Sequence, residues 1–287
     1  MKNRLSILIA GILVSNPISI TCAQNLYVSD DVANSIYVFS PGGVQSTFAS
    51  GLNQPWGLAV NSTGNLFEAD TASGNIYEFT PGGVRSTFAS GLANPSGLAF
   101  DNAGNLFVAN YGSGTVTKIT PGGIPTTFAS GVGLATALAF DSAGNLFVSA
   151  TGSGGIFKIT PGGAVSTFSA GFYGAGLAFN NVGNLFAGGD QGFPNGYIAE
   201  FTSGGVQSTF ATGLSNPVGL AFNSAGNLFV ANQVNGVITE ITPAGAESNF
   251  ATVQQTQGLT FQPVPEPSIW AMVGTAGFAA LGLRRRA

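Results

Sequence analysis

The sequence of 287 residues contains no histidine and only one cysteine, and charged side chains make up 7% of it. Without histidine, Ser-His-Asp and Cys-His catalytic arrangements are excluded, and a lone cysteine excludes disulfide frameworks and Cys/His metal sites. The 43 glycines disfavour helix interiors, and lysine and glutamate, which favour helices, are scarce. Valine, isoleucine, phenylalanine and threonine suit pleated strands. Because 44% of the residues are hydrophobic, the chain can bury a core, and we expect an all-β fold.

The N-terminal segment has the order of a secretory signal peptide. Two basic residues precede the charge-free apolar run 5–14, and small and polar residues lead to Ala23. We therefore expect residues 1–23 to be removed by signal peptidase. The alternative, a lipoprotein role for Cys22, is disfavoured because residues 19–21 lack the leucine and the small residue that usually precede a lipoprotein cysteine.

The C-terminal segment combines a short motif, an apolar run and a basic cluster. The apolar run 269–283 has 15 residues and would span about 22 Å as a helix, short of the roughly 30 Å hydrocarbon core. The motif comprises Val264, Pro265, Glu266 and Pro267, and the basic cluster comprises Arg284, Arg285 and Arg286. Residues 264–287 resemble the PEP-CTERM sorting tail, which implies processing by an exosortase in the envelope of a bacterium. A plain C-terminal membrane anchor is the alternative.

The sequence between these segments repeats with a period near 40 residues. The triplet Asn-Leu-Tyr/Phe recurs in steps of 40, 40, 40, 39 and 43 residues. Each unit contains four strand-like runs separated by Gly, Asn and Pro turns, which is typical of a propeller blade. The triplets begin at Asn25, Asn65, Asn105, Asn145, Asn184 and Asn227. Six such units predict a six-bladed β-propeller of four-stranded blades.

A run resembling Gly-Leu-Ala-Phe occurs once in each unit and is predicted to form the innermost strand. Its small apolar residues suit the crowded position around the propeller axis. Because the chain starts with the second strand of a unit, the last such run, 258–261, is expected to complete the first blade. Residues 24–263 are thus predicted to form one propeller in which N-terminal strands pair with a C-terminal inner strand.

The repeat pattern resembles NHL-repeat and gluconolactonase-like propellers over residues 25–261. The matching residues are Pro-x-Gly-Leu-Ala-Phe-Asp/Asn followed by Gly-Asn-Leu-Phe-Val-Ala-Asn/Asp, as in 95–110 and 217–232. The resemblance implies the architecture but does not fix an activity. It also implies that enzymatic relatives hold a divalent metal through Glu, Asn and Asp, or, in antibiotic lyases, use a histidine that this chain lacks.

The lengths of the connections divide each blade into two ends. The connection between the second and third strands is three residues longer in the unit beginning at Asn184, and the connection from the outermost strand to the next inner strand is one residue shorter in two units. In an up-and-down blade these connections lie on one face, the variable face, and the constant ones lie on the other, the invariant face. Function concentrates on loops, so we expect the variable face to bind.

Amides, carboxylates and aromatic rings on the variable face suit the hydroxyls and C–H faces of a sugar. Trp56 is a lone large aromatic among small loop residues and has no role in a turn. The loop 188–196 is enlarged relative to its equivalents. Trp56 and this loop therefore stand out from ordinary solvated loops. The residues predicted to bind a ligand are Trp56, Tyr111, Tyr173, Asp190, Gln191, Phe193 and Asn195. Other polar residues expected on this face include Asp31, Asn53, Gln54, Asn94, Asn216, Gln233, Gln254 and Gln255.

A metal site and an enzymatic role form the alternative hypothesis. Asp30, Asp70 and Asn110 end equivalent second strands and offer the hard oxygen ligands that Ca²⁺ or another divalent cation prefers. A metal-dependent gluconolactonase-like hydrolase would need such a site. The sequence shows nothing that converges on it from opposite blades, and it therefore favours a protein that is not an enzyme.

The charge of the predicted propeller excludes nucleic acid as a partner. Between the two processing segments the chain has eleven acidic and three basic side chains, a net charge of −8 that repels phosphates. The sequence therefore predicts a secreted binding or structural component of the cell envelope or exopolysaccharide matrix, with a glycan or an envelope protein as its partner. It would meet the membrane only through its tail before processing. A matrix protein without a specific ligand remains the third alternative.

Overall fold

The computed structural model describes residues 24–152, 154–189 and 195–263. These residues form 24 strands in six four-stranded antiparallel sheets. The predicted signal peptide and sorting tail lie outside the described residues. Across the described ranges, no helix has the length and hydropathy that a membrane span requires.

Each sheet is one blade, and its four strands succeed one another from the axis to the rim. Blade 1 contains β24 (Thr256–Phe261), β1 (Leu26–Asp30), β2 (Ser35–Phe39) and β3 (Gln45–Ser50). Blade 2 contains β4 (Pro55–Val60), β5 (Leu66–Asp70), β6 (Asn75–Phe79) and β7 (Arg85–Ala89), and blade 3 contains β8 (Pro95–Phe100), β9 (Leu106–Asn110), β10 (Thr115–Ile119) and β11 (Pro125–Ser130). Blade 4 contains β12 (Ala135–Phe140), β13 (Leu146–Ala150), β14 (Gly155–Ile159) and β15 (Val165–Ala170). Blade 5 contains β16 (Gly174–Phe179), β17 (Leu185–Gly189), β18 (Gly196–Phe201) and β19 (Gln207–Leu214), and blade 6 contains β20 (Pro217–Phe222), β21 (Leu228–Asn232), β22 (Val237–Ile241) and β23 (Glu247–Thr252).

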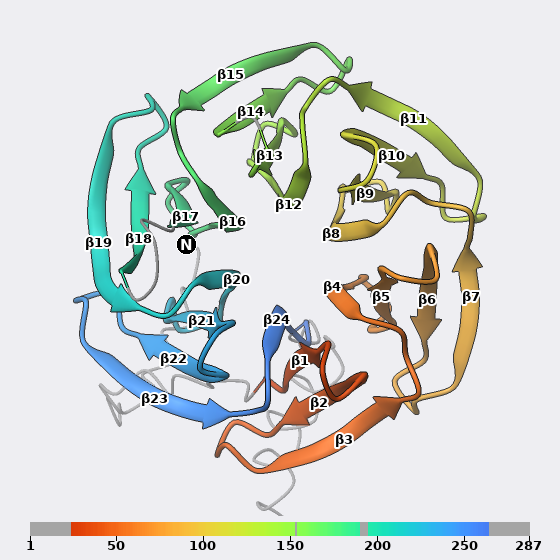
Figure 1. The fold of residues 1–287 in the computed structure, drawn as a ribbon, viewed down its shortest axis with the longest axis horizontal. Helices are drawn as coiled ribbons and strands as arrows, with labels where there is room; N and C mark the ends of the chain where they lie inside the picture. Colours follow the sequence, from red (N-terminus) through yellow and green to blue (C-terminus); the bar gives the residue numbers. More distant parts are fainter. Residues whose placement is uncertain (1–23, 153, 190–194, 264–287) are drawn as a thin grey trace, which may run out of the picture.

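The blades stand in a ring around a central axis, which confirms the predicted six-bladed propeller (Figure 1). The ring closes in blade 1, where β24 from the end of the propeller pairs with β1 from its start, Leu26 opposite Phe261. Beyond this pair, the backbone amide of Gln262 donates to the backbone carbonyl of Asn25 at 2.9 Å. The side-chain amide of Gln24 donates to the backbone carbonyl of Gln262 at 2.9 Å. Both ends of the propeller are therefore held on one blade.

Glycine in the innermost strands allows neighbouring blades to approach each other closely. A Cβ atom on Gly57 would overlap the carbonyl oxygen of Ser96 in the next blade, and one on Gly219 would overlap the carbonyl oxygen of Gln257. The small residue that the sequence repeats in this strand is thus required by the crowding around the axis.

A ladder of aromatic rings joins successive blades. The ring of Phe107 on β9 lies edge-on to Phe128 of its own blade, with centroids 4.9 Å apart, and to Phe140 of blade 4, at 5.1 Å. Edge-to-face pairs stabilise beyond the area that they bury. The corresponding second-strand aromatics are Tyr27, Phe67, Phe147, Phe186 and Phe229. The phenylalanine content of the chain is largely explained by this ladder.

The register of each blade assigns its connections to the two faces as predicted. In blade 2, Asp70 pairs with Pro55 on one side and with Asn75 on the other, so the two connections of variable length meet at the same end. The two constant hairpins meet at the opposite end. Gln24 and Gln262 lie at that opposite end, so the first and last residues of the propeller lie at the invariant face.

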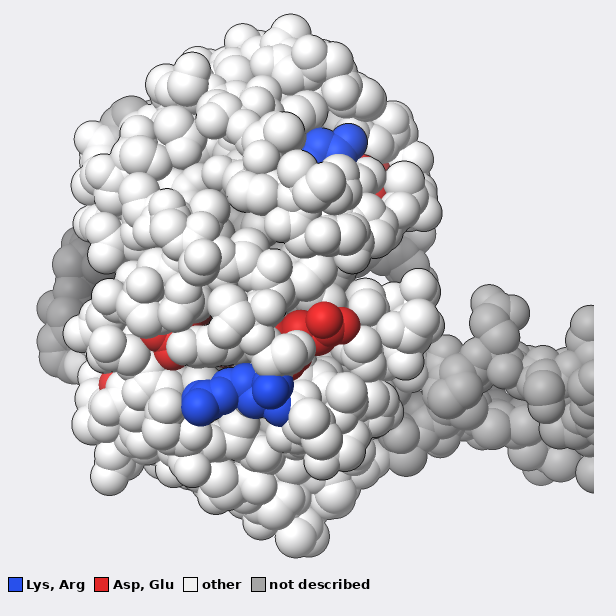
Figure 2. Space-filling model, turned by 90° about the vertical axis from the view of Figure 1, so that its right-hand side faces the viewer, with Lys and Arg blue, Asp and Glu red and all other residues white. Residues whose placement is uncertain are grey.

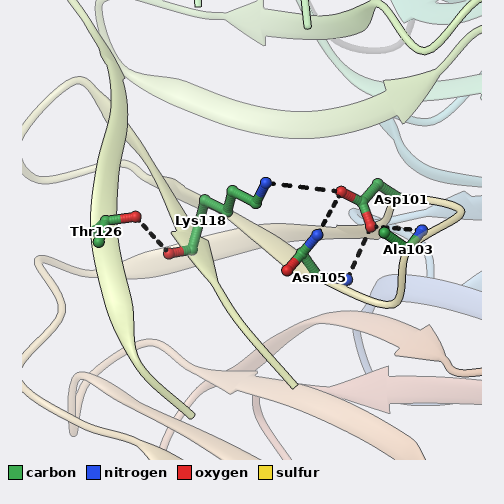
Figure 3. Close-up of polar contacts among 5 residues, drawn as sticks. All are labelled: Asp101, Ala103, Asn105, Lys118 and Thr126. Carbon is green, nitrogen blue, oxygen red and sulfur yellow. Dashed lines mark hydrogen bonds and ion pairs between the residues drawn. The ribbon is translucent and has the colours of Figure 1, made fainter. Parts of the chain in front are cut away.

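The invariant face is built from turns whose side chains satisfy one another (Figure 3). Asp101 accepts hydrogen bonds from the backbone amides of Ala103 and Asn105, at 3.0 and 2.8 Å, and from the Asn105 side chain at 2.8 Å. Lys118 on β10 pairs with the same carboxylate at 4.0 Å. The Asp101 carboxylate therefore caps the turn between β8 and β9.

In each of blades 2 to 6, one carboxylate lies beside the asparagine that immediately precedes the second strand. In blade 3 the carboxylate comes from the turn, and a lysine stands on the third strand; in blade 2 the turn residue is Asn61, and the carboxylate comes from the third strand. Asn65 there donates to Glu78 at 2.7 Å. The equivalent pairs are Asn145–Asp141, Asn184–Glu200 and Asn227–Glu240. An aspartate in the turn is thus accompanied by a lysine on the third strand, and an asparagine in the turn by a glutamate there.

Candidate functional site

A cavity of about 670 Å³ opens at the axis of the ring on the variable face. We call it the axial cup. Blades 2 to 6 contribute to its wall through the start of the innermost strand, the residue before that strand and the residue after the second strand. Its lining residues are Trp56, Thr71, Asn94, Ser96, Tyr111, Thr136, Thr151, Tyr173, Gly174, Ala175, Asn216, Val218 and Gln233.

The innermost ring of the cup takes the same register position from each blade. This position is the second residue of the innermost strand, and its side chain differs in every blade: Trp56, Ser96, Thr136, Ala175, Val218 and Gln257. The first five line the cup, and the fully buried Gln257 lines the narrower channel of about 80 Å³ that continues along the axis. Only the tryptophan stood out in the sequence, although all six could have been found from their place before the Gly-Leu pair of each repeat, which is Ala-Leu in blade 4.

Three of the predicted ligand-binding residues are brought together at the cup. Trp56 contributes from β4, Tyr111 follows β9 and Tyr173 precedes β16. The two tyrosine side chains are 41% and 59% exposed, so they are accessible to a ligand. Asn195 is exposed and does not line the cup. Asp190, Gln191 and Phe193 lie outside the described residues.

The position of Tyr173 depends on the hairpin beneath it. Its ring lies over Gly154 in the β13–β14 hairpin, where a Cβ atom would come within 2.6 Å of Cζ. Gly154 also has a positive φ of 62°, which favours glycine. The hairpin sequence of blade 4 therefore sets how far this ring projects over the cup.

A chain of side-chain hydrogen bonds borders the cup at blades 6 and 1. Asn216 donates to Gln233 at 2.6 Å, Gln233 donates to Gln257 at 3.1 Å, and Gln257 donates to a carboxylate oxygen of Asp31 at 2.8 Å. Each amide thus fixes the orientation of the next. Burial raises the pKa of Asp31, and the hydrogen bond from Gln257 opposes this rise.

Each of the three predicted metal ligands already has hydrogen-bond partners within the protein. Asp30 is fully buried, and its two oxygens accept backbone amides of its own loop and of the loop before β24, including that of Gln254 at 3.0 Å. Asp70 accepts the amide of Asn53 at 2.7 Å, and Asn110 bonds within its own blade, to Thr115 and Thr117. These side chains hold the loops of the variable face in place.

The electrostatic character of the cup follows from its lining. No lysine, arginine, aspartate or glutamate is among the described residues that line it. Within the described ranges, no group of three or more His, Cys, Asp or Glu side chains is arranged to hold a metal ion. On the side of the ring seen in Figure 2, the few charged residues form small groups in which blue and red lie close together, and the rest of the surface is uncharged.

Solved structures share this fold at low sequence identity, whereas no protein-family model and no curated protein matches the chain. A chain of the nidogen/laminin complex has a TM-score of 0.74 at 15% identity, covering 84% of this chain and 99% of that one. A catalytically inactive His-to-Ala variant of virginiamycin B lyase from Staphylococcus aureus, with quinupristin, has a TM-score of 0.64 at 15% identity, covering 85% and 94%. A gluconolactonase candidate has a TM-score of 0.63 at 17% identity, covering 76% and 88%. These likenesses show the propeller fold, and the activity has to be argued from the site.

Proposed function

We propose that this protein is a secreted propeller that binds an uncharged glycan in the axial cup and serves as a component of the cell envelope or exopolysaccharide matrix. The observation that carries the proposal is the composition of the cup. Aromatic rings from three blades line the opening, and the other polar side chains among its described lining residues carry hydroxyls or amides.

The chemistry of a sugar matches this lining on both counts. Its C–H faces stack on rings such as Trp56, Tyr111 and Tyr173, and its hydroxyls need both donors and acceptors, which the amides of Asn94, Asn216 and Gln233 supply. Because none of the described lining residues is charged, they give no advantage to an anionic or cationic ligand. A volume of about 670 Å³ lies within the range of small-molecule sites.

Binding is favoured over hydrolysis or elimination by the same residues. The described lining offers no carboxylate, amine, imidazole or thiol to act as acid, base or nucleophile. The lyase of similar fold is catalytically inactive in its His-to-Ala variant, and this chain contains no histidine. The carboxylates of Asp30 and Asp70 already accept backbone amides.

The position of the first and last residues of the propeller supports attachment with the cup facing outward. Gln24 and Gln262 lie at the invariant face, opposite the cup, and the proposed sorting tail follows them in the sequence. Sorting through Pro265-Glu266-Pro267 would therefore leave the cup open to the surrounding matrix. In a bacterium with an exosortase, deleting residues 264–287 should abolish processing and surface retention without reducing secretion; unchanged retention would overturn this part of the proposal.

The binding proposal is tested by titrating the chain with a panel of neutral and charged oligosaccharides. The chain has two tryptophans, so in a Trp270→Phe variant the fluorescence reports Trp56 alone. We expect a saturable change with neutral glycans, and calorimetry on Tyr111→Ala and Tyr173→Ala should show at least a tenfold loss of affinity.

The matched control is Val84→Ala, which removes an exposed apolar side chain, 68% exposed, outside the cup. This variant should bind like the parent chain. The proposal is wrong if no glycan binds in either assay, or if the control weakens binding as much as the cup variants do.

A further inference from the structure

A glutamate stands inside the ring where the other blades carry aliphatic residues. Glu68 on β5 has no exposed surface, and neither of its carboxylate oxygens has a hydrogen-bond partner. The equivalent second-strand residues of the other blades, all fully buried, are Val28, Val108, Val148, Ala187 and Val230. The signal was visible in the sequence, where Leu-Phe-Glu-Ala-Asp stands in place of Leu-Phe-Val-Ala-Asn.

Glu68 faces the seam between blades 1 and 2. Leu66, two residues earlier on β5, packs with Tyr27 and Ile36 of blade 1, and side chains two apart on a strand share a face. Directly opposite Glu68 lie Leu58 on the inner side and Tyr77 on the outer side. The carboxyl group is thus enclosed by the apolar cluster that joins the two blades.

Few charged or titratable groups surround this carboxyl. Asp70 follows on the same strand, Tyr77 and Arg85 stand on β6 and β7, and Tyr27 belongs to β1. The inner strands β4 and β24 contain no titratable residue. Arg85 is engaged elsewhere, because its guanidinium lies over the Tyr77 ring and donates to the carbonyl of Gly51 at 3.3 Å.

We propose that Glu68 makes the packing between blades 1 and 2 depend on pH. The contact between the two blades is stable while the carboxyl is protonated and is destabilised when the carboxyl ionises. A neutral carboxyl can stay in an apolar seam at moderate cost, whereas an unpaired carboxylate there cannot. The seam also borders the cup, since Ser29 of blade 1 donates across it to the carbonyl of Trp56.

The direction of the pH effect follows from the carboxyl's surroundings. Burial, and then the charge of Asp70, hold the pKa of Glu68 well above its usual range, while Arg85 lowers it. In the unfolded chain the group titrates near pH 4.3. Its contribution to stability is therefore complete below that pH and is lost as the pH rises toward the folded-state pKa. Within this window the unfolding constant rises by up to about tenfold per pH unit.

The test compares the full chain with Glu68→Gln, which keeps the shape but cannot ionise. Unfolding midpoints are measured between pH 5 and pH 8. The midpoint of the variant relative to the parent should rise steadily with pH, because only the parent pays for ionisation. Glu68→Val, the residue of four other blades, should show the same trend if the glutamine variant folds poorly.

The control is Glu247→Gln on the exposed outer strand β23, whose midpoint difference from the parent should not change with pH. Hydrogen exchange, corrected for its intrinsic pH dependence, should show β4, β5 and β1 of the parent losing protection first, and β12 and β13 of blade 4 keeping theirs. A midpoint difference that is constant with pH, or a loss of protection spread evenly over the six seams, would overturn the proposal.

Discussion

The two faces of the propeller use the same repeat in opposite ways. On the invariant face, equivalent positions carry the same or exchangeable residues, and these bond to one another, as Asn105 does to Asp101. On the variable face, the second residue of the innermost strand is Trp56 in one blade and Val218 in another. The carboxylates of Asp30 and Asp70, in contrast, play the same role in two blades, because each accepts a backbone amide of a loop on this face.

This difference shows where the repeat is free to vary. A side chain that satisfies a turn or fills a seam is fixed by its neighbours, whereas side chains at the rim of the cup, such as Tyr111 and Tyr173, are largely exposed to solvent. Exposed residues on the variable face can therefore change without loss of the fold, and this freedom is what a binding site requires. From this contrast we expect four sets of changes to have effects of decreasing size.

Opening the ring should have the largest effect, because both faces exist only while the blades form a closed circle. Deleting residues 257–263 removes most of β24 and leaves β1 without its inner partner. We expect a loss of more than 5 kcal/mol, or roughly 10–20 °C in melting temperature for a domain of this size. Deleting residues 264–287 should leave the melting temperature within a few degrees of the parent. Equal melting temperatures for the two deletions would show that closure by β24 does not stabilise the ring.

The next largest effect should separate two aromatic residues four positions apart. Phe107 is buried between blades 3 and 4, so Phe107→Ala should destabilise the protein by about 3–5 kcal/mol. Tyr111 is 41% exposed at the cup, and Tyr111→Ala should change stability by less than about 0.5 kcal/mol. Urea denaturation of both variants measures the difference. Similar losses would mean that the cup is part of the core and not a free surface.

An intermediate effect is expected from the carboxylates under the cup. In Asp30→Ala, the amides of Val32, Ala33 and Gln254 lose their acceptor inside the protein, which should cost about 1–3 kcal/mol. The loss should be the same with and without added Ca²⁺, measured by thermal unfolding. If Ca²⁺ stabilises the parent chain and not the variant, Asp30 is a metal ligand as the sequence alternative holds.

Much of this contrast was predictable from the sequence. The period of 40 residues and the final Gly-Leu-Thr-Phe run predicted the six blades and the closing strand, because a strand's place in a blade is set by local pattern. Trp56 was predictable because a large aromatic has no role in a turn. The bonds that Asp30 accepts from the backbone amides of Gln254 and Gln255 were not, since these residues lie more than 220 positions away in the chain. Glu68 was overlooked because a single substitution in a buried row changes neither the period nor the spacing.

The smallest effect should come from the carboxylate pairs of the invariant face. Asp101→Asn keeps the turn, as Asn61 and Asn223 do in other blades, but removes the carboxylate that the Asn105 side chain and Lys118 share. The partly exposed ion pair contributes little and the hydrogen bond about 1 kcal/mol, so we expect a loss near that value.

The rescue of this variant tests the pairing directly. Adding Lys118→Glu to Asp101→Asn recreates the pattern of blade 2, in which Asn65 donates to Glu78. The double variant should return to within about 0.5 kcal/mol of the parent, whereas Lys118→Glu alone places two carboxylates side by side and should be the least stable of the three. If the effects of the single changes simply add in the double variant, measured by urea denaturation, the residues do not form a unit. On the invariant face, as on the variable face, the blades would then resemble one another only in their backbone.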